Sequence, residues 1–177
     1  MSDPTAPEID WPDQIHRQLR QWDVRQVAHV PDAGHKRLIQ LCGADNRIAV
    51  VPLTTEEEGV AVLAGAWLGG QRGALLMQSS GVGNCINMLS LPKICRLPLL
   101  MIVTMRGEWG EFNPWQVPMG RATPAVLELA GVLCFRADQP DEVEPTVAAA
   151  ARMAFEGPQA VAVLLSQRLI GAKSFVK

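Results

Sequence analysis

Several short segments of this chain are apolar from end to end, and segments with helical periodicity separate them. Examples are IAVVPL at residues 48–53, PLLMIVT at 98–104 and AVAVLL at 160–165. A strand that lacks alternating polar positions must be covered on both faces, which is typical of a parallel sheet between two layers of helices. The sequence therefore predicts an α/β fold, a three-layer sandwich around a doubly wound parallel sheet of roughly six strands.

The positions of the expected elements follow from the same alternation. Strands are expected at residues 24–30, 48–53, 73–78, 98–104, 132–137 and 160–166. Helices are expected at residues 11–22, 54–70, 83–91, 122–131 and 141–157, with one more around Leu38 and Leu41 that Asp32 would cap. Residues 1–9 are polar and proline-rich, so we expect a flexible leader there and a single domain over residues 10–177.

The composition excludes several classes of function. The chain has a formal net charge of −2, so it offers no basic surface for nucleic acid. It contains neither a secretory signal nor a run of about 18 uncharged apolar residues that would cross a bilayer. None of its four cysteines belongs to a CxxC pair. We therefore expect a cytoplasmic protein with reduced thiols that binds neither nucleic acid nor membrane.

Ligands of doubly wound sheets bind beyond the carboxyl ends of the strands. We therefore expect the functional residues in four loops that follow expected strands. These loops are VPDAG at residues 30–34, TTEEEG at 54–59, QSSGVGN at 78–84 and the long loop from Met105 to about Arg121.

The glycines of QSSGVGN, Gly81 and Gly83, allow the backbone to approach a ligand or a helix closely. A dinucleotide fingerprint requires a third glycine where this sequence has Ile86, and no P-loop motif occurs. A non-catalytic nucleotide-binding module remains an alternative, and so does tight packing of a strand against a helix with no ligand at all.

Three consecutive glutamates, Glu56, Glu57 and Glu58, open the helix expected at residues 54–70. The helix dipole stabilises carboxylates in a first turn, and Thr55 and Glu58 have the spacing of a capping box. Consecutive helical residues point about 100° apart, so we expect at least one glutamate to face the strand ends. A carboxylate sheltered there could share a proton with a ring nitrogen of a ligand.

Four motifs, in the same order along the chain, resemble the pyrimidine-binding domain of thiamine-diphosphate enzymes. Among these enzymes the chain is most similar to the phosphonopyruvate and sulfopyruvate decarboxylases, over roughly residues 24–170. The motifs are Val30-Pro31-Asp32, Glu56 to Gly59, Met77 to Asn84, and Arg106-Gly107-Glu108-Trp109-Gly110.

The resemblance implies that two chains share the cofactor. The residues beside the aminopyrimidine of thiamine diphosphate would be Pro31, Asp32, Ser80, Gly81, Val82, Gly83 and Asn84. The family binds the diphosphate and Mg²⁺ with a second domain that carries a GDG motif, and GDG does not occur in this chain. The implied arrangement is an α subunit without metal ligands of its own, in a hetero-oligomer whose β subunit holds the diphosphate and Mg²⁺.

The resemblance also implies a glutamate that binds the pyrimidine ring and activates the cofactor. In relatives this glutamate precedes a Gly-aromatic pair by nine and ten residues. Here Gly65 lies nine residues after Glu56, whereas Trp67 lies ten residues after Glu57. We favour Glu57 as the catalytic residue because the aromatic position also aligns, and Glu56 is the alternative.

Substrate contacts are expected from His35, Arg106 and Gln116. His35 could instead be a structural histidine, and Arg106 could instead brace its loop through a salt bridge. Relatives commonly have a histidine after the glutamine of the long loop. In this chain Val117 follows Gln116, so the sequence departs from the family pattern there.

The resemblance implies an activity as well. The expected reaction is decarboxylation of 3-sulfopyruvate to sulfoacetaldehyde and carbon dioxide, in coenzyme M biosynthesis or in sulfonate breakdown. Phosphonopyruvate is the alternative substrate, because a phosphonate is nearly isosteric with a sulfonate. A further alternative is a non-catalytic partner that only supports a complete enzyme.

Overall fold

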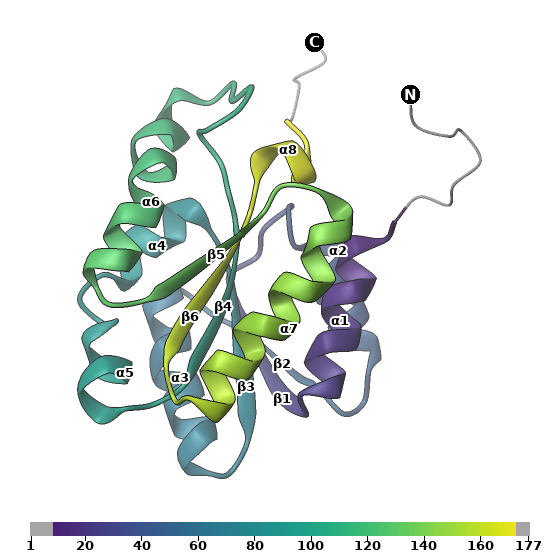
Figure 1. Ribbon diagram of the computed structural model, residues 1–177, viewed down its shortest axis with the longest axis vertical. Helices are drawn as coiled ribbons and strands as arrows, with labels where there is room; N and C mark the ends of the chain where they lie inside the picture. The colour runs from purple at the N-terminus through teal and green to yellow at the C-terminus, as the bar shows by residue number, and fades with distance from the viewer. Residues whose placement is uncertain (1–8, 173–177) are drawn as a thin grey trace.

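The computed structural model describes residues 9–172, which contain a sheet of six strands that all run parallel. The strand order is β2-β1-β3-β4-β6-β5 (Figure 1). The strands are β1 (Val24–His29), β2 (Ala49–Pro52), β3 (Arg72–Gln78), β4 (Leu99–Thr104), β5 (Leu133–Ala137) and β6 (Ala160–Leu165). Each lies within a segment that the sequence predicts as a strand or extends it by one residue, which confirms the doubly wound parallel sheet.

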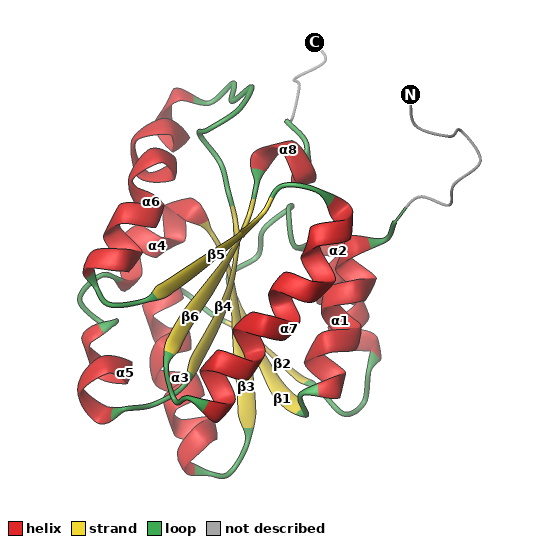
Figure 2. Cartoon of the chain, in the orientation of Figure 1, coloured by secondary structure: helices red, strands yellow, loops and turns green. Residues whose placement is uncertain are grey.

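Helices cover both faces of this sheet and complete the predicted three-layer sandwich (Figure 2). They are α1 (Trp11–Gln21), α2 (Lys36–Ala44), α3 (Glu56–Leu68), α4 (Ser79–Cys85), α5 (Ser90–Cys95), α6 (Val117–Leu129), α7 (Pro140–Glu156) and α8 (Gln167–Ile170), with a 3₁₀ turn η1 (Pro114–Gln116) before α6. Helices α1, α2 and α7 pack on one face, whereas α3, α4, α5 and α6 pack on the other. No helix within residues 9–172 is both long enough and apolar enough to span a bilayer. The predicted leader lies outside the described residues, apart from Ile9.

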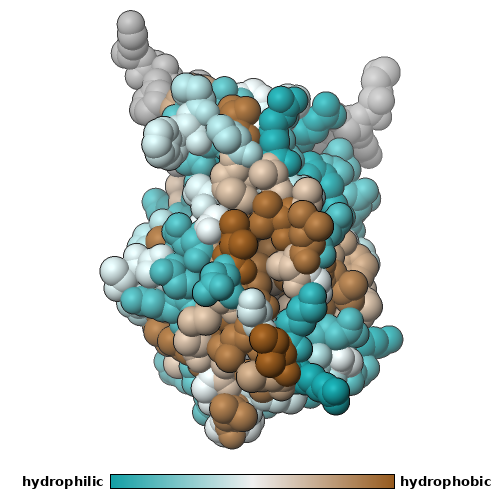
Figure 3. Space-filling view, turned by 90° about the vertical axis from the view of Figure 1, so that its left-hand side faces the viewer, coloured by the Kyte–Doolittle hydropathy of each residue, from teal (hydrophilic) through white to brown (hydrophobic). Residues whose placement is uncertain are grey.

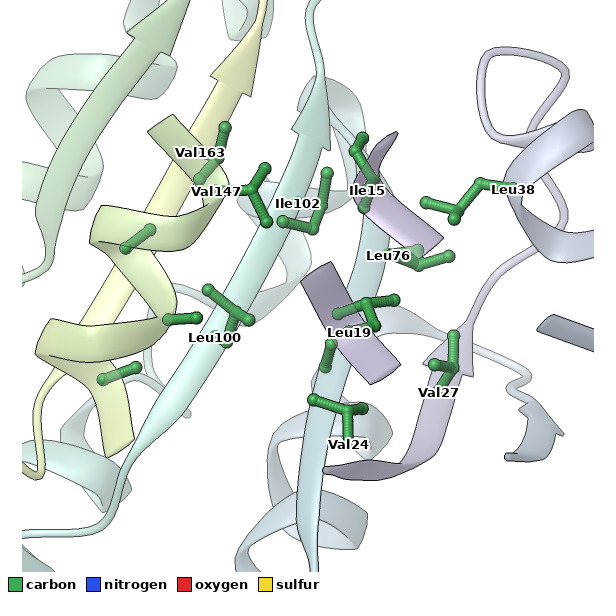
Figure 4. Packing of buried hydrophobic residues seen from close by; sticks show 14 of the residues in the cluster. Ile15, Leu19, Val24, Val27, Leu38, Leu76, Leu100, Ile102, Val147 and Val163 are labelled. Carbon is green, nitrogen blue, oxygen red and sulfur yellow. The ribbon is translucent and has the colours of Figure 1, made fainter. Parts of the chain in front are cut away.

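The central strands explain why the sequence shows no polar alternation. Every residue of β4 is buried. Its Leu100 and Ile102 pack with Leu19 of α1 and Val147 of α7 on one face (Figure 4), and its Met101 belongs to the cluster on the opposite face. The edge strand β2 is equally apolar in sequence but has exposed residues at both of its ends. The uninterrupted apolar runs thus reflect burial on two faces in the centre of the sheet.

Two helix boundaries differ from the prediction. The sequence predicts one helix at residues 83–91 that ends at Pro92, but the structure has α4 directly after β3 and a separate α5 after a turn. Pro92 lies in the first turn of α5, where a missing backbone N–H breaks no helical hydrogen bond. Helix α6 begins at Val117 rather than at residue 122, so the end of the expected long loop is helical.

His35 ties the loop after β1 to the centre of the sheet. Its side chain has no exposed surface, and Nε2 lies 3.2 Å from Met77 O and 3.1 Å from Ile102 O. A carbonyl oxygen only accepts hydrogen bonds, so Nε2 carries the ring proton. Burial lowers the pKa of His35 and outweighs the opposite influence of Asp32. An enclosed ring cannot contact a substrate, so the structure corrects the predicted role of His35 to the structural one.

Acid should destabilise the fold through His35. Its pKa in the folded chain lies below the ordinary value of 6.5, so below that pH the unfolded chain gains a proton that the folded chain does not. This contribution to stability is complete above about pH 6.5 and is lost as the pH falls, by at most about 1.4 kcal/mol per pH unit. In His35→Gln, whose amide can donate to the same carbonyls, this part of the slope should disappear. Urea unfolding at pH 7.5 and pH 5.5 measures the difference.

The matched control is His29→Gln, which changes a second largely buried histidine at the end of β1. This control keeps His35 and should therefore keep the part of the acid sensitivity that the burial of His35 causes. An unchanged slope in the His35 variant would show that its ring does not set this sensitivity.

Candidate active site at the carboxyl edge of the sheet

The carboxyl ends of β1, β3 and β4 lie side by side and bring the predicted loops together. Asp32 follows β1, α4 starts directly at the end of β3, and Arg106 follows β4. Helix α3 connects the edge strand β2 to β3, and its first residue, Glu56, lies at the same edge, because its side chain contacts Asn84 of α4. In a doubly wound sheet this edge is where ligands bind.

Glu56 is the sheltered carboxylate of this edge. Its side chain is buried, with 8% of the residue exposed, and its Oε2 accepts a hydrogen bond of 2.8 Å from Asn84 Nδ2. A Cβ atom at Gly81 would overlap the Glu56 carboxyl group, so the carboxylate occupies the space that a side chain at position 81 would fill. The sequence predicts that the backbone at Gly81 approaches a ligand or a helix closely. In the structure it approaches the Glu56 side chain at the start of α3.

The other two glutamates of the triplet point elsewhere. Glu57 accepts a hydrogen bond from the hydroxyl of Thr55, which holds the pKa of Glu57 below its ordinary value. Glu58 is exposed and accepts from the backbone N–H of Thr54 at 2.8 Å. The predicted capping box is therefore wrong, because the Thr55 side chain binds a glutamate instead of a backbone N–H. The expectation that at least one glutamate turns inward is confirmed by Glu56.

Asp32 belongs to a hydrogen-bond network over the end of β3. Its two oxygens accept from Gln78 Nε2 at 2.9 Å and from Thr104 Oγ1 at 2.6 Å, and the Ser80 hydroxyl donates to Gln78 Oε1 at 2.9 Å. Burial opposes the charge of Asp32, but the bond from Thr104, the nearby His35 and the bonds from the Gly34 backbone and Gln78 together leave its pKa below the ordinary value. Asp32 does not cap α2 as predicted, because His35 occupies the cap position and makes no side-chain cap bond.

Arg106 braces its loop from within. Its Nε and Nη2 donate to the two oxygens of Glu111 at 2.6 Å each, and the ion pair is largely buried. Glu111 also accepts from Gln167 Nε2 at 2.9 Å, and the guanidinium lowers the pKa of Glu111 to about 2. The salt-bridge alternative describes Arg106 correctly, and the predicted substrate contact, through guanidinium N–H groups that Glu111 does not bind, stays a prediction. Sequence reasoning missed Glu111 and Gln167, whose partners lie on different segments.

The remaining predicted site residues differ in how exposed they are and in what their side chains contact. Pro31 is exposed, whereas the Val82 side chain is fully buried, so only the backbone of Val82 can face a ligand. Gly83 packs against α6, and a Cβ there would lie 3.2 Å from Met119 Sδ. Gln116 ends η1, and its buried Oε1 has no hydrogen-bond partner among residues 9–172. The substrate contact predicted for Gln116 stays a prediction.

The edge fits the pyrimidine end of thiamine diphosphate. Oε2 of Glu56 binds Asn84, whereas no hydrogen bond to Oε1 is present among the described residues. One oxygen of a sheltered carboxylate is thus available to a ring nitrogen, beside a backbone that carries no side chain at Gly81. The Asp32 carboxylate in the loop after β1 and the Ser80 hydroxyl at the start of α4 are linked through Gln78 and could orient a polar ring substituent.

Replacement of Gly81 by alanine should separate folding from the geometry of Glu56. The added methyl group would overlap Cγ, Cδ and Oε1 of Glu56, so the Glu56 side chain should rotate away and lose its bond to Asn84. The melting temperature should fall little or rise, because alanine in a helix is favoured over glycine by up to about 1 kcal/mol. Thermal unfolding and a crystal structure of the variant measure the two effects.

Gly83→Ala is the matched control, because its methyl group meets only the adaptable side chain of Met119 and should leave Glu56 in place. A Gly81→Ala structure with an unmoved Glu56 would contradict the assignment of this glycine.

No family model matches this chain. The chain is similar to the sulfopyruvate decarboxylase subunit alpha of Methanococcus maripaludis, with 37% identity over 152 residues that cover 85% of this chain and 91% of the relative. It is also similar to the phosphonopyruvate decarboxylase of Streptomyces viridochromogenes, with 42% identity over 108 residues that cover 60% of this chain and 27% of that longer protein.

Among solved structures the chain resembles a 2-oxoglutarate:ferredoxin oxidoreductase from Magnetococcus marinus, with a TM-score of 0.74. The match covers 96% of this chain and 31% of that chain, and at 13% identity it shows the fold alone. The relationship to the Methanococcus protein is far stronger, because it combines 37% identity with almost complete coverage of the relative. The chain therefore belongs to the family of sulfopyruvate decarboxylase alpha subunits.

Proposed function

We propose that this chain is the α subunit of a thiamine-diphosphate-dependent carboxy-lyase that converts 3-sulfopyruvate to sulfoacetaldehyde and carbon dioxide. The relatives that match most of the chain are named for this enzyme. The observation that carries the proposal is the sheltered Glu56 carboxylate against Gly81, because a pyrimidine ring needs a partner of this kind at its nitrogen.

Glu56, rather than Glu57, is the residue that we assign to the ring nitrogen. Bound thiamine diphosphate supplies the electron sink that loss of carbon dioxide from a 2-oxo acid requires. Glu56 would hold and return a proton at the ring nitrogen through Oε1, the oxygen that Asn84 does not bind. Glu57 is bound to Thr55 at the start of the helix, so it is poorly placed for this role.

We propose that a β subunit supplies the site for the diphosphate and Mg²⁺. The sequence has no GDG motif, and the relatives with the greatest coverage are named as alpha subunits. An apolar groove of about 580 Å³ between α5 and α6 supports an obligate partner (Figure 3). Ile94 and Leu129 at this groove are 78% and 85% exposed, and exposed apolar side chains that gather in one patch are typical of a protein interface.

Phosphonopyruvate is the second candidate substrate. The 42% identity to the Streptomyces phosphonopyruvate decarboxylase over the matched residues favours it. Sulfonate and phosphonate groups are both tetrahedral anions, so the shape of the anion alone does not distinguish the two substrates.

A cytoplasmic location agrees with the state of the cysteines. Cys42 and Cys85 are buried free thiols, and burial raises the pKa of each to about 12. Such thiols are unreactive and pack as small apolar groups. We therefore propose that the enzyme works in a reducing compartment.

Co-expression with its neighbouring genes should yield a complex of this chain with a protein that carries a GDG motif. With thiamine diphosphate and Mg²⁺, the complex should release carbon dioxide from 3-sulfopyruvate faster than from phosphonopyruvate, and neither subunit should do so alone. Coupled aldehyde detection measures both rates. Faster turnover of phosphonopyruvate would transfer the proposal to the second candidate, and activity of this chain alone would refute the shared site.

Glu56→Gln should abolish most of the activity of the complex, because an amide cannot exchange a proton with the ring nitrogen. The expected loss in kcat is about 10²- to 10⁴-fold. Glu57→Gln is the matched control on the adjacent position, and its activity should stay within about threefold of the parent, as for other surface changes. Steady-state rates of the two variants decide between the residues. A large loss in Glu57→Gln alone would restore the assignment that the sequence favours.

A further inference from the structure

Glu56 has a single side-chain partner among the described residues, the amide of Asn84. Asn84 and Gly81 are three residues apart on α4, so they lie on the same face of that helix. This face is turned toward the first turn of α3, because both residues meet the Glu56 side chain. One position thus leaves space for the carboxylate while the other supplies a hydrogen-bond donor to it.

The two oxygens of Glu56 are in different situations as a result. Asn84 Nδ2 lies 2.8 Å from Oε2, whereas Oε1 lies toward Gly81 without a hydrogen bond among residues 9–172. A donor on one oxygen fixes the rotation of the carboxyl plane, because that plane would otherwise turn freely about the last side-chain bond. Oε1 is therefore held in a set direction before any ligand arrives.

We propose that Asn84 is a positioning residue that orients Glu56 for proton exchange with the cofactor ring. This inference rests on the proposed function of the site. It gives Asn84 a role in orienting Glu56, whereas the family resemblance implies only that Asn84 lies beside the aminopyrimidine. The amide suits this task because it donates a hydrogen bond without bringing a charge. A cation at position 84 would form an ion pair with Glu56 and compete with the ring nitrogen for the carboxylate.

The position of Asn84 in the chain accounts for the precision of this contact. Helix α4 begins at the residue that follows β3, so no flexible loop separates it from the sheet. The far side of α4 packs against α6, where Met119 meets Gly83. The Asn84 amide is thus carried by an element that is fixed on two sides, as a positioning group requires.

The test uses the complex of this chain with its co-purifying partner subunit. Asn84→Ala removes the donor, and Asn84→Asp places a second carboxylate beside Glu56. Both variants should bind thiamine diphosphate and should keep the KM for substrate within about threefold. The kcat and the rate of hydrogen–deuterium exchange at the reactive carbon of the bound cofactor should fall together, by about 10- to 100-fold in Asn84→Ala and further in Asn84→Asp, because misplacement of a catalytic group costs about this much.

Asn87→Ala is the matched control, because Asn87 is an exposed asparagine shortly after α4 with no side-chain hydrogen bond among the described residues. It should leave the kcat, the exchange rate and the melting temperature unchanged. Melting temperatures of the Asn84 variants close to that of the parent are also expected, since the residue is exposed apart from its contact with Glu56.

A double-mutant cycle separates positioning from other roles. If Asn84 acts through Glu56, then Asn84→Ala should cause little further loss in a Glu56→Gln background, whereas an independent role would make the two losses multiply. The proposal would be overturned if Asn84→Ala and Asn84→Asp both kept the full kcat and the full exchange rate. It would also be overturned if the losses in kcat of Asn84→Ala and Glu56→Gln multiplied in the double variant. A parent complex that neither binds thiamine diphosphate nor releases carbon dioxide would instead overturn the proposed function itself, so the two failures are distinguishable.

Discussion

The close approach of α4 to the first turn of α3 sets the whole site. It places the Glu56 carboxylate in the space that a side chain at Gly81 would occupy, and it brings the Asn84 amide within 2.8 Å of that carboxylate. A sheltered carboxylate is costly unless polar groups satisfy it, so the donor and the missing side chain are needed together. The absence of a side chain at Gly81 therefore makes room for a carboxylate of the same chain.

The topology of the sheet makes this approach possible. The strand order places β3 between β1 and β4, and α3 returns from the edge strand β2 across β1 to reach β3. The start of α3 and the start of α4 are thereby brought to the same edge, although all of α3 and all of β3 separate them in the sequence. Asp32 reaches over the end of β3 to Thr104 of β4 and joins the three neighbouring strands by side-chain bonds. The edge is consequently rigid where a ligand would bind.

The sequence predicts the strands well because burial on both faces leaves a pattern that few other folds produce. It fails at the boundaries of α4 and α6, where a glycine-rich turn and a proline give signals that suit either a loop or a first helical turn. The choice between Glu56 and Glu57 also lies beyond the sequence, because two spacings disagree by one residue and a single helical step redirects a side chain by about 100°. Glu111 and Gln167 escape prediction for a related reason: their bond joins segments that only the folded sheet brings together.

The long loop after β4 is held, like Glu56, by hydrogen bonds and an ion pair within the same chain. The buried pair of Arg106 and Glu111 and the bonds of Gln167 hold the start of the loop on the sheet, whereas Trp115 is 85% exposed at its end. A pre-ordered surface loses little conformational freedom on association, so more of the contact free energy appears as affinity. In the proposed complex, the Glu56 carboxylate and this loop would already be in place when the β subunit docks, so the internal bonds of this chain would lower the conformational cost of assembling the shared site.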